Sequence, residues 1–184
     1  MIIGIAGYAG SGKDTVRKIL ETKYGFQGLA FADPLRKALE TLNPIVDVNR
    51  GEITRYTQAV EKVGYQAAKE KFSEMRRLLQ VLGTEVGRDL FGPDVWVDAL
   101  NVEWTKRGNP NLAISDMRFP NELDFVDDFG FSVWVERPGV GPVNAHVSDN
   151  GLKKTECDFW INNSGSLEDL ESEVDAMLAK MEGW

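Results

Sequence analysis

The sequence predicts an α/β protein in which a parallel sheet lies between two layers of helices. Two observations support this fold class. Short apolar runs, such as residues 2–6 and 131–136, have the composition of strands that are buried on both faces. Segments with apolar side chains at three- and four-residue spacing alternate with these runs. Alternating strands and helices build a parallel sheet, because each right-handed crossover lays a helix over one face.

The strands are identified by their apolar residues and by what ends them. The first breaks at Gly7, the third is followed by Asp116, and the fourth gives way to Arg137 and Pro138. In chain order, strands are expected at residues 2–6, 28–31, 112–115, 131–136 and 159–162. Parallel sheets bind ligands at the carboxyl ends of their strands, so the residues just past these ends are candidates for a site.

The helices are identified by apolar stripes and by end signals. Asp33 suits an N-cap with Pro34 in the first helical position, and Ser166 with Asp169 resembles a capping box before the last helix. In chain order, helices are expected at residues 13–23, 34–42, 52–63, 66–82, 95–106, 119–130 and 166–181. Gly83 and Gly87 are expected to interrupt the longest of these patterns.

Two stretches lack a clear period. Residues 43–51 hold Asn, Pro, Asp and Gly and are expected to form a loop. The segment of residues 137–156 is the longest without a period, which is typical of a functional lid or of a loose loop. It contains His146, the only histidine. We interpret it as a lid contact, because a lone histidine is more often structural or exposed than catalytic.

The composition is that of one globular domain spanning residues 1–184. A net charge of −8 argues against a broad surface for nucleic acid or for an anionic membrane, since both require a basic face. The single cysteine, Cys157, excludes an intramolecular disulfide. No apolar run approaches membrane-spanning length and no signal-peptide pattern is visible, so a cytoplasmic protein is expected.

The turn after the first strand carries the most specific motif. Gly7-Tyr-Ala-Gly-Ser-Gly-Lys-Asp-Thr15 stands between a buried strand and an amphipathic helix and fits the phosphate-binding P-loop. Its glycines let backbone N–H groups turn inward on a polyphosphate, while the new helix points its N-terminus at the same anion. Lys13 is expected to reach the terminal phosphates. A glycine-rich turn that merely joins strand to helix is the alternative.

Magnesium ligation is the part of the motif that departs from the usual pattern. Asp14 stands where a serine or threonine normally holds the metal, and the first hydroxyl comes at Thr15. Asp116, just past a buried strand, has the position of an acidic residue that orients magnesium directly or through water, with a helix cap as the alternative. Thr15 and Asp116 are therefore the expected metal residues.

Three arginines are candidates for neutralising phosphate charge. Arg88 lies in a glycine-flanked segment, Arg118 lies two residues past Asp116, and Arg137 lies at the start of the expected lid. A guanidinium can hold a phosphate with two parallel hydrogen bonds, whereas a solvated surface arginine is the alternative for each. Trp96 follows the Arg88 segment closely enough to line a base pocket. The residues expected to be catalytic are Lys13, Arg88, Asp116, Arg118 and Arg137.

Several stretches taken together resemble one family. Residues 7–15, 31–36, 79–89 with Trp96 behind them, and 114–122 resemble the deoxynucleoside monophosphate kinases of bacteriophages, within the P-loop kinase group that includes adenylate kinase and dephospho-CoA kinase. The tail of residues 158–170 is similar to the final strand and helix of this family and of dephospho-CoA kinase. The Gly-Lys-Asp-Thr ending resembles what members of the family carry, which accounts for Asp14.

The resemblance implies a P-loop NTPase fold with a five-stranded parallel sheet, a helical acceptor-binding insertion and a short lid. It also implies ATP and Mg²⁺, a phage origin and action in the host cytoplasm. The chain is expected to form a single P-loop kinase domain with the acceptor-binding region at about 33–107 and the lid at about 137–156. The implied substrate-binding residues are Asp33, Arg36, Arg88, Trp96 and Arg118. The residues expected to bind the cofactor ATP are Gly7, Ala9, Gly10, Ser11, Gly12, Lys13, Asp14, Thr15, Asn162 and Gly165.

The activity implied is transfer of the ATP γ-phosphate to a deoxynucleoside monophosphate. A dephospho-CoA kinase or another small-metabolite kinase on the same fold is the first alternative, and a P-loop ATPase or regulatory nucleotide-binding module is the second. The expected partners are ATP and a dNMP, without nucleic acid or membrane, and a homodimer is left open.

Overall fold

The computed structural model describes residues 1–141 and 151–181, so His146 lies outside the described residues. The chain divides into two compact units. One, which we call the sheet unit, consists of residues 1–31 and the residues from 100 onward, and the other, the helical unit, consists of residues 32–99. The boundary at residue 99 falls inside one helix, α6 (Val95–Lys106).

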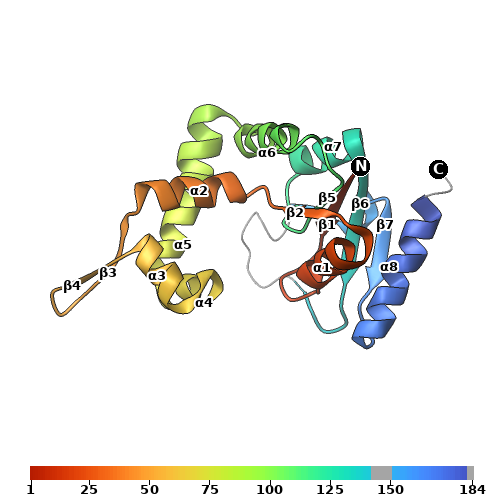
Figure 1. Cartoon of the computed structure of the whole chain (residues 1–184), viewed down its shortest axis with the longest axis horizontal. Coiled ribbons are helices and arrows are strands. Elements are labelled where there is room, and N and C mark those ends of the chain that lie inside the picture. The colour runs from red at the N-terminus through yellow and green to blue at the C-terminus, as the bar shows by residue number, and fades with distance from the viewer. Residues whose placement is uncertain (142–150, 182–184) are drawn as a thin grey trace. The chain divides into compact units, whose positions relative to one another are not determined.

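The sheet unit is built on five parallel strands, as the sequence predicts (Figure 1). They are β1 (Ile2–Ala6), β2 (Gln27–Leu29), β5 (Leu112–Ile114), β6 (Gly130–Glu136) and β7 (Phe159–Asn162). Their order across the sheet is β2-β5-β1-β6-β7, which places β1 in the middle. The turn that follows β1 therefore leaves the sheet at its centre, with the ends of β5 and β6 on either side.

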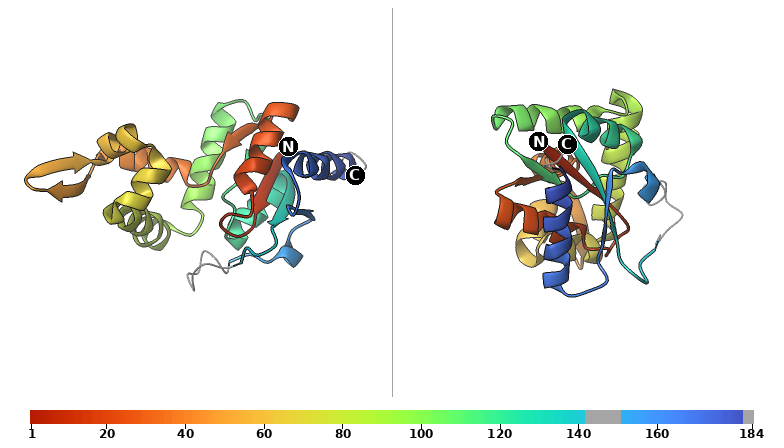
Figure 2. Two further views of the ribbon diagram at one scale, coloured as in Figure 1. Left: turned by 90° about the horizontal axis from the view of Figure 1, so that it is seen from below. Right: turned by 90° about the vertical axis from the view of Figure 1, so that its right-hand side faces the viewer.

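Helices cover both faces of this sheet, which confirms the predicted three layers (Figure 2). On one face α1 (Lys13–Tyr24) and α8 (Leu167–Met181) bury a continuous apolar core against the strands. On the other face α7 (Pro120–Phe129) packs so closely on β1 that a Cβ at Gly4 would lie 2.6 Å from the Val126 side chain. A short 3₁₀ turn (Lys154–Glu156) precedes β7.

The helical unit has its own small core. Its elements are α2 (Asp33–Leu42), β3 (Ile45–Asn49), β4 (Glu52–Arg55), α3 (Tyr56–Val63), α4 (Tyr65–Lys71), α5 (Ser73–Gln80), the π-helix η1 (Val81–Phe91) and the first turns of α6. The core consists of Leu39, Val46, Tyr56, Ala59, Ala68 and Met75. Burial raises the pKa of the Tyr56 phenol to about 12, so this hydroxyl stays neutral at physiological pH.

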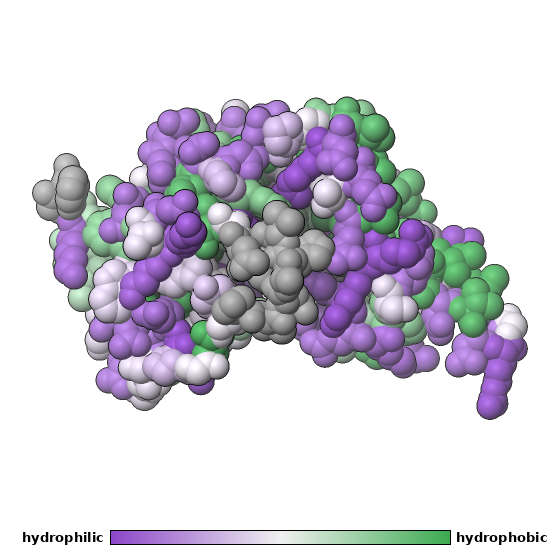
Figure 3. Space-filling model, turned by 180° about the vertical axis from the view of Figure 1, so that it is seen from behind, coloured by the Kyte–Doolittle hydropathy of each residue, from purple (hydrophilic) through white to green (hydrophobic). Residues whose placement is uncertain are grey.

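The prediction of a loop at residues 43–51 is wrong, because β3 and β4 form an antiparallel hairpin there. Val48 pairs with Ile53, and the chain turns at Arg50 and Gly51, which have φ of 50° and 87°. Two central residues with positive φ are typical of the tight turns that match strand twist. The predicted helix over 52–63 consequently begins only at Tyr56. Figure 3 shows apolar surface at this hairpin, where Val48 is 64% exposed.

The prediction that Gly83 and Gly87 interrupt a helix is also wrong. The pattern of residues 66–82 breaks earlier, at Phe72, and the chain then continues from α5 into the π-helix through both glycines. Both are buried, and a Cβ at Gly87 would lie 2.5 Å from the Trp96 ring. These glycines make room for packing and do not end the helix.

Of the two predicted helix N-caps, one is confirmed and the other is wrong. Ser166 and Asp169 form the predicted capping box, since Asp169 N–H donates to Ser166 Oγ at 3.2 Å and Ser166 N–H donates to Asp169 Oδ2 at 2.8 Å. Asp33 is not the cap of α2, because Ala32 occupies that position and Pro34 follows in the first turn.

Candidate nucleotide-binding site

The turn after β1 has the geometry of a phosphate-binding loop. Gly7 ends the strand with a φ of 140°, and a Cβ there would lie 2.4 Å from the Val135 carbonyl oxygen on β6. Gly12 caps α1 with a φ of 106°, a conformation that residues with a Cβ rarely adopt. The loop thus reaches the N-terminus of α1, where backbone N–H groups lack helical partners and favour an anion.

Lys13 is held within this loop. Its Nζ donates to the carbonyl oxygens of Gly7 at 2.7 Å and of Tyr8 at 2.8 Å. The ammonium is therefore folded back over the start of the loop. Ser11 N–H donates to the Tyr8 carbonyl at 3.1 Å and closes the same turn. The predicted residues Ala9 and Gly10 form the exposed tip of the loop.

The end of β7 contributes Asn163, which is not among the residues expected above to bind ATP. Its Nδ2 donates to the Ser11 carbonyl at 2.8 Å. The selected neighbour Asn162 is exposed, and the selected Gly165 lies beside Asp169 at the start of α8, where a Cβ would come within 2.4 Å of the carboxylate. The alternation of side chains along a strand was the signal that could have separated the two asparagines.

Two carboxylates of the predicted site accept hydrogen bonds from residues that follow β5 and β2. Ser115 Oγ donates to Asp14 Oδ1 at 2.7 Å, so the residue at the unusual motif position links the first turn of α1 to the end of β5. Asp116, one residue further, accepts the N–H of Phe31 at 2.9 Å through Oδ1. Both contacts lie inside the sheet unit, and both fix a carboxylate that the sequence places in the site.

The segment after Asp116 is organised by Glu122, which is only 2% exposed. Its Oε2 accepts the N–H of Arg118 at 2.7 Å and of Phe119 at 3.1 Å. A buried carboxylate that takes two backbone donors fixes the loop that enters α7. The Arg118 side chain is left exposed.

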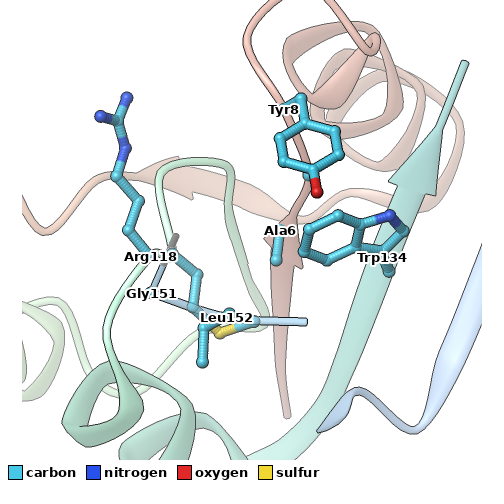
Figure 4. A pocket seen from close by; sticks show the side chains of 8 residues that line it. Ala6, Tyr8, Arg118, Trp134, Gly151 and Leu152 are labelled. Carbon is cyan, nitrogen blue, oxygen red and sulfur yellow. The ribbon is translucent and has the colours of Figure 1, made fainter. Parts of the chain in front are cut away.

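A small pocket opens beside the loop, within the sheet unit. It is lined by Ala6, Gly7, Tyr8, Met117, Arg118, Trp134, Gly151 and Leu152. The Tyr8 and Trp134 rings meet edge to face with their centroids 5.3 Å apart. Figure 4 shows these rings on one wall, while the guanidinium of Arg118 extends away from them. The pocket thus has aromatic and apolar walls and one cationic side chain at its edge.

Arg137 directly follows β6 and is exposed. It begins the segment predicted as a lid, of which residues 142–150 lie outside the described residues. The two ends of this segment are joined by an ion pair, since Lys154 Nζ lies 2.7 Å from Glu136 Oε2. The lid itself remains a prediction.

The helical unit holds the other candidates. Arg36 Nη1 lies 2.8 Å from Asp33 Oδ1, and its guanidinium lies 4.9 Å from the centroid of the Tyr65 ring. Arg88 Nη1 and Trp96 Nε1 both donate to the Gly83 carbonyl, at 3.1 and 2.9 Å. Arg88 on the π-helix and Trp96 on α6 therefore share one carbonyl oxygen as their hydrogen-bond acceptor.

The donor groups fit a magnesium ion only if phosphate and water complete its coordination. Within residues 1–141 and 151–181, no group of three or more His, Cys, Asp or Glu side chains could hold a metal. Mg²⁺ is usually bound through one or two carboxylates together with substrate phosphates and waters. Asp116 offers one such carboxylate, and the Thr15 hydroxyl in the first turn of α1 is a further oxygen donor. No helix in the described ranges is both long and apolar enough to cross a bilayer.

A parallel sheet with a P-loop after its central strand defines the class of P-loop kinases and NTPases. The family model "Deoxynucleotide monophosphate kinase" matches residues 46–174. A protein of Acanthamoeba polyphaga mimivirus, described provisionally as a deoxynucleotide monophosphate kinase, is 28% identical over 199 residues, which cover 95% of this chain and 94% of that protein. The deoxynucleotide monophosphate kinase of Escherichia phage RB69 is 32% identical over 124 residues, 62% of this chain and 51% of the phage protein. Among solved structures, shikimate kinase from Aquifex aeolicus aligns with 100% of this chain and 97% of its own at a TM-score of 0.48 and 18% identity.

The chain belongs to the deoxynucleotide monophosphate kinase family. The predicted family and P-loop kinase fold are confirmed, and with them an ATP-dependent phosphotransferase. Membership supports a deoxynucleotide monophosphate kinase over both alternatives. ATP as co-substrate follows from the family. The roles of the individual site residues remain predictions.

Proposed function

We propose that this protein transfers the γ-phosphoryl group of ATP to the phosphate of a deoxynucleoside monophosphate, giving ADP and a dNDP. The observation that carries this proposal is the loop from Gly7 to Lys13, with its ammonium on the loop carbonyls and the N-terminus of α1 behind it. Such a loop binds polyphosphate, and the family supplies the acceptor class.

The donor side lies in the sheet unit. Phosphoryl transfer requires little bond-making by the protein, which instead places two anions in line and neutralises the charge that develops. Lys13 and the loop N–H groups supply that charge for ATP. The Ser11 hydroxyl is buried, and within the described residues it has no hydrogen-bond partner, so a bound phosphate offers it one. Arg118 and Arg137 are exposed and are proposed to reach phosphate oxygens from the strand ends.

The acceptor side is proposed to lie in the helical unit. Arg88 holds the dNMP phosphate, because a guanidinium can bind a phosphate through two parallel hydrogen bonds. Its Nη1 contact with the Gly83 carbonyl fixes the side chain to the π-helix. Asp33 and Arg36 orient the nucleoside, and Trp96 supports the Arg88 segment or meets the base. Stacking of Arg36 on Tyr65 holds that guanidinium in one orientation.

Magnesium is proposed to be held by Asp116, directly or through water, and by the Thr15 hydroxyl. When bound, the ion would neutralise phosphate oxygens and orient them. Asp14 contributes by fixing the first turn of α1 to Ser115, beside Asp116.

The test is a coupled assay of ADP release with a panel of dNMPs, NMPs and dephospho-CoA. The proposal expects release to depend on a dNMP. Equal rates with and without every acceptor would contradict the kinase and favour an ATPase, whereas activity only with dephospho-CoA would favour the other kinase. The panel also gives the base preference.

Partners and location extend the same proposal. A net charge of −8 supports small nucleotides as partners in place of nucleic acid, and phage relatives support action in the host cytoplasm. A homodimer is an assembly that light scattering of the purified protein can test.

A further inference from the structure

Asn163 links the tail of the chain to the phosphate-binding loop. Its backbone N–H donates to the Glu136 carbonyl at the end of β6, at 2.7 Å. Its side-chain Nδ2 donates to the Ser11 carbonyl, at 2.8 Å. The residue is thus fixed to the sheet by its main chain and fixes the loop by its side chain.

The contact falls where the loop enters α1. A Cβ at Gly12 would lie 2.3 Å from Asn163 Nδ2, so the asparagine packs directly on this glycine. The Gly12 carbonyl accepts the N–H groups of Thr15 and Val16, both at 3.0 Å, which begin the helix. Asn163 therefore touches the single residue that joins the loop to the helix.

The Ser11 carbonyl and the Gly12 N–H belong to one planar peptide unit. In a trans peptide these two groups point in opposite directions. A hydrogen bond that holds the carbonyl toward Asn163 consequently holds the Gly12 N–H away from Asn163. Without it, a glycine at this position could rotate the peptide at little steric cost.

The structure assigns Asn163 as a positioning residue that sets the Ser11–Gly12 peptide for binding the phosphates of the donor nucleotide. This inference rests on the proposed function, in which the loop binds ATP. It predicts an effect on phosphate binding that does not depend on the base. A direct contact between Asn163 and the base predicts the opposite, since only nucleotides with that base would respond.

The test compares Asn163→Ala and Asn163→Asp with Ser164→Ala, a change at the next, exposed residue. Calorimetry measures binding of ATP, GTP and inorganic tripolyphosphate to the full chain. Loss of a neutral hydrogen bond is expected to raise all three Kd values by a similar factor, roughly three- to tenfold. Asn163→Asp has nearly the same shape but sets a carboxylate against the carbonyl, so its effect is expected to be larger. Ser164→Ala should match the wild type.

Two further measurements separate positioning from general damage. The KM for the dNMP should stay near the wild-type value in Asn163→Ala, because that site is proposed to lie in the other unit. Amide hydrogen exchange across residues 8–13, measured without nucleotide, should become faster in the same variant while the sheet strands stay protected.

Loss of ATP binding with unchanged GTP and tripolyphosphate binding would overturn the inference in favour of base recognition. Unchanged binding of all three ligands, or unchanged exchange in the loop, would overturn it outright. A failure of the proposed function can be distinguished from a failure of this inference. In the first case the wild type would release no ADP in response to a dNMP, while the hydrogen-exchange result would still report on the loop. If Asn163→Ala does not fold, Asn163→Asp carries the same comparison.

Discussion

The two compact units differ in charge although both are proposed to bind phosphate. The helical unit carries 10 Lys and Arg against 11 Asp and Glu, whereas the rest of the chain carries 11 against 18. The loop with the clearest phosphate-binding geometry thus lies in the more acidic unit. Anion binding there is proposed to depend on local groups, namely the loop N–H donors and the Lys13 ammonium.

The units also differ in how they bury apolar side chains. The strands β1, β5 and β6 contribute residues such as Ile3, Ile114 and Val135 that are 0% exposed. Both units expose some large apolar residues, but the most exposed of them among the described residues, Leu42, Val48, Leu90 and Phe91, all lie in the helical unit. A substitution at the proposed donor site in the sheet unit should therefore alter activity without altering the fold. A substitution at the proposed acceptor site in the helical unit should more readily destabilise the fold.

The largest expected effect comes from Lys13→Ala in the sheet unit. Removing a charge aimed at the transferring phosphate should lower kcat by about 10²–10³-fold, because the contact strengthens in the transition state. The fold should survive, since Lys13 lies outside the apolar core that α1 and α8 bury against the strands. Steady-state kinetics and far-UV circular dichroism check this, with Lys18→Ala on the exposed side of α1 as the control. Normal turnover in a folded variant would remove Lys13 from the mechanism.

The next effect should appear in the helical unit with Arg88→Ala. A charge-assisted hydrogen bond contributes about 1.5–3 kcal/mol, so kcat/KM for the dNMP should fall roughly tenfold to a hundredfold or more. The KM for ATP should change little. Arg88→Lys should recover only part of the loss, because an ammonium keeps the charge but cannot make paired bonds.

Arg77→Ala is the matched control for Arg88, since Arg77 is exposed and pairs with Glu74 at the surface. Exposed pairs of this kind contribute little to stability. Weakened ATP binding with an unchanged acceptor KM in Arg88→Ala would move Arg88 to the donor side and leave Arg118 as the better acceptor candidate.

A smaller effect, on stability, should distinguish the two glycines of the π-helix. A Cβ at Gly87 would lie 2.5 Å from the Trp96 ring, but one at Gly83 would meet only a Leu35 methyl at 3.4 Å. Gly87→Ala should therefore lower the free energy of unfolding by about 1–3 kcal/mol. Gly83→Ala should be neutral or gain up to about 1 kcal/mol from helix propensity. Urea unfolding measures both, and equal effects would contradict the packing argument.

The sheet unit follows from the sequence because its signals are local. Apolar runs end at glycine, aspartate or proline, and the loop motif fixes the site from Gly7 to Thr15. The hairpin was missed because Pro44, Asp47 and Asn49 indicate a loop by composition. The alternation in β3 and the Arg50-Gly51 turn were weaker signals for it.

The parts of the site that the sequence did not predict depend on tertiary contacts. From the sequence alone Gly87 indicates a helix break, but in the structure it makes room for the Trp96 ring. The partner of Asp14 is Ser115, which lies 101 residues away along the chain. The choice between Asn162 and Asn163 depends on how the chain leaves β7. No local pattern carries the contacts of Gly87 and Asp14, whereas the alternation of side chains along β7 was a local signal for Asn163.

The smallest expected effect concerns the cap of α8 in the sheet unit. Ser166→Ala removes a side chain that accepts the Asp169 N–H and donates to Asp169 Oδ2 at 3.0 Å. Loss of such a cap should lower Tm by about 2–4 °C and leave kcat and both KM values unchanged. Ser172→Ala on the same helix is the control. Its hydroxyl only donates back to the Glu168 carbonyl, which adds no cap.

The decrease in Tm caused by Ser166→Ala should also depend on pH, in a direction set by the pKa of Asp169. The backbone N–H and the side chain of Ser166 both lower the pKa of that carboxyl. A carboxyl whose folded pKa lies below its unfolded value of about 3.9 stabilises the fold above that value, and this stabilisation is lost as the pH falls through the folded pKa. The Tm difference between wild type and Ser166→Ala should therefore be full at neutral pH and narrow below about pH 4. Scanning calorimetry at neutral and acidic pH checks this, and an unchanged difference would show that the cap does not involve the ionised carboxylate.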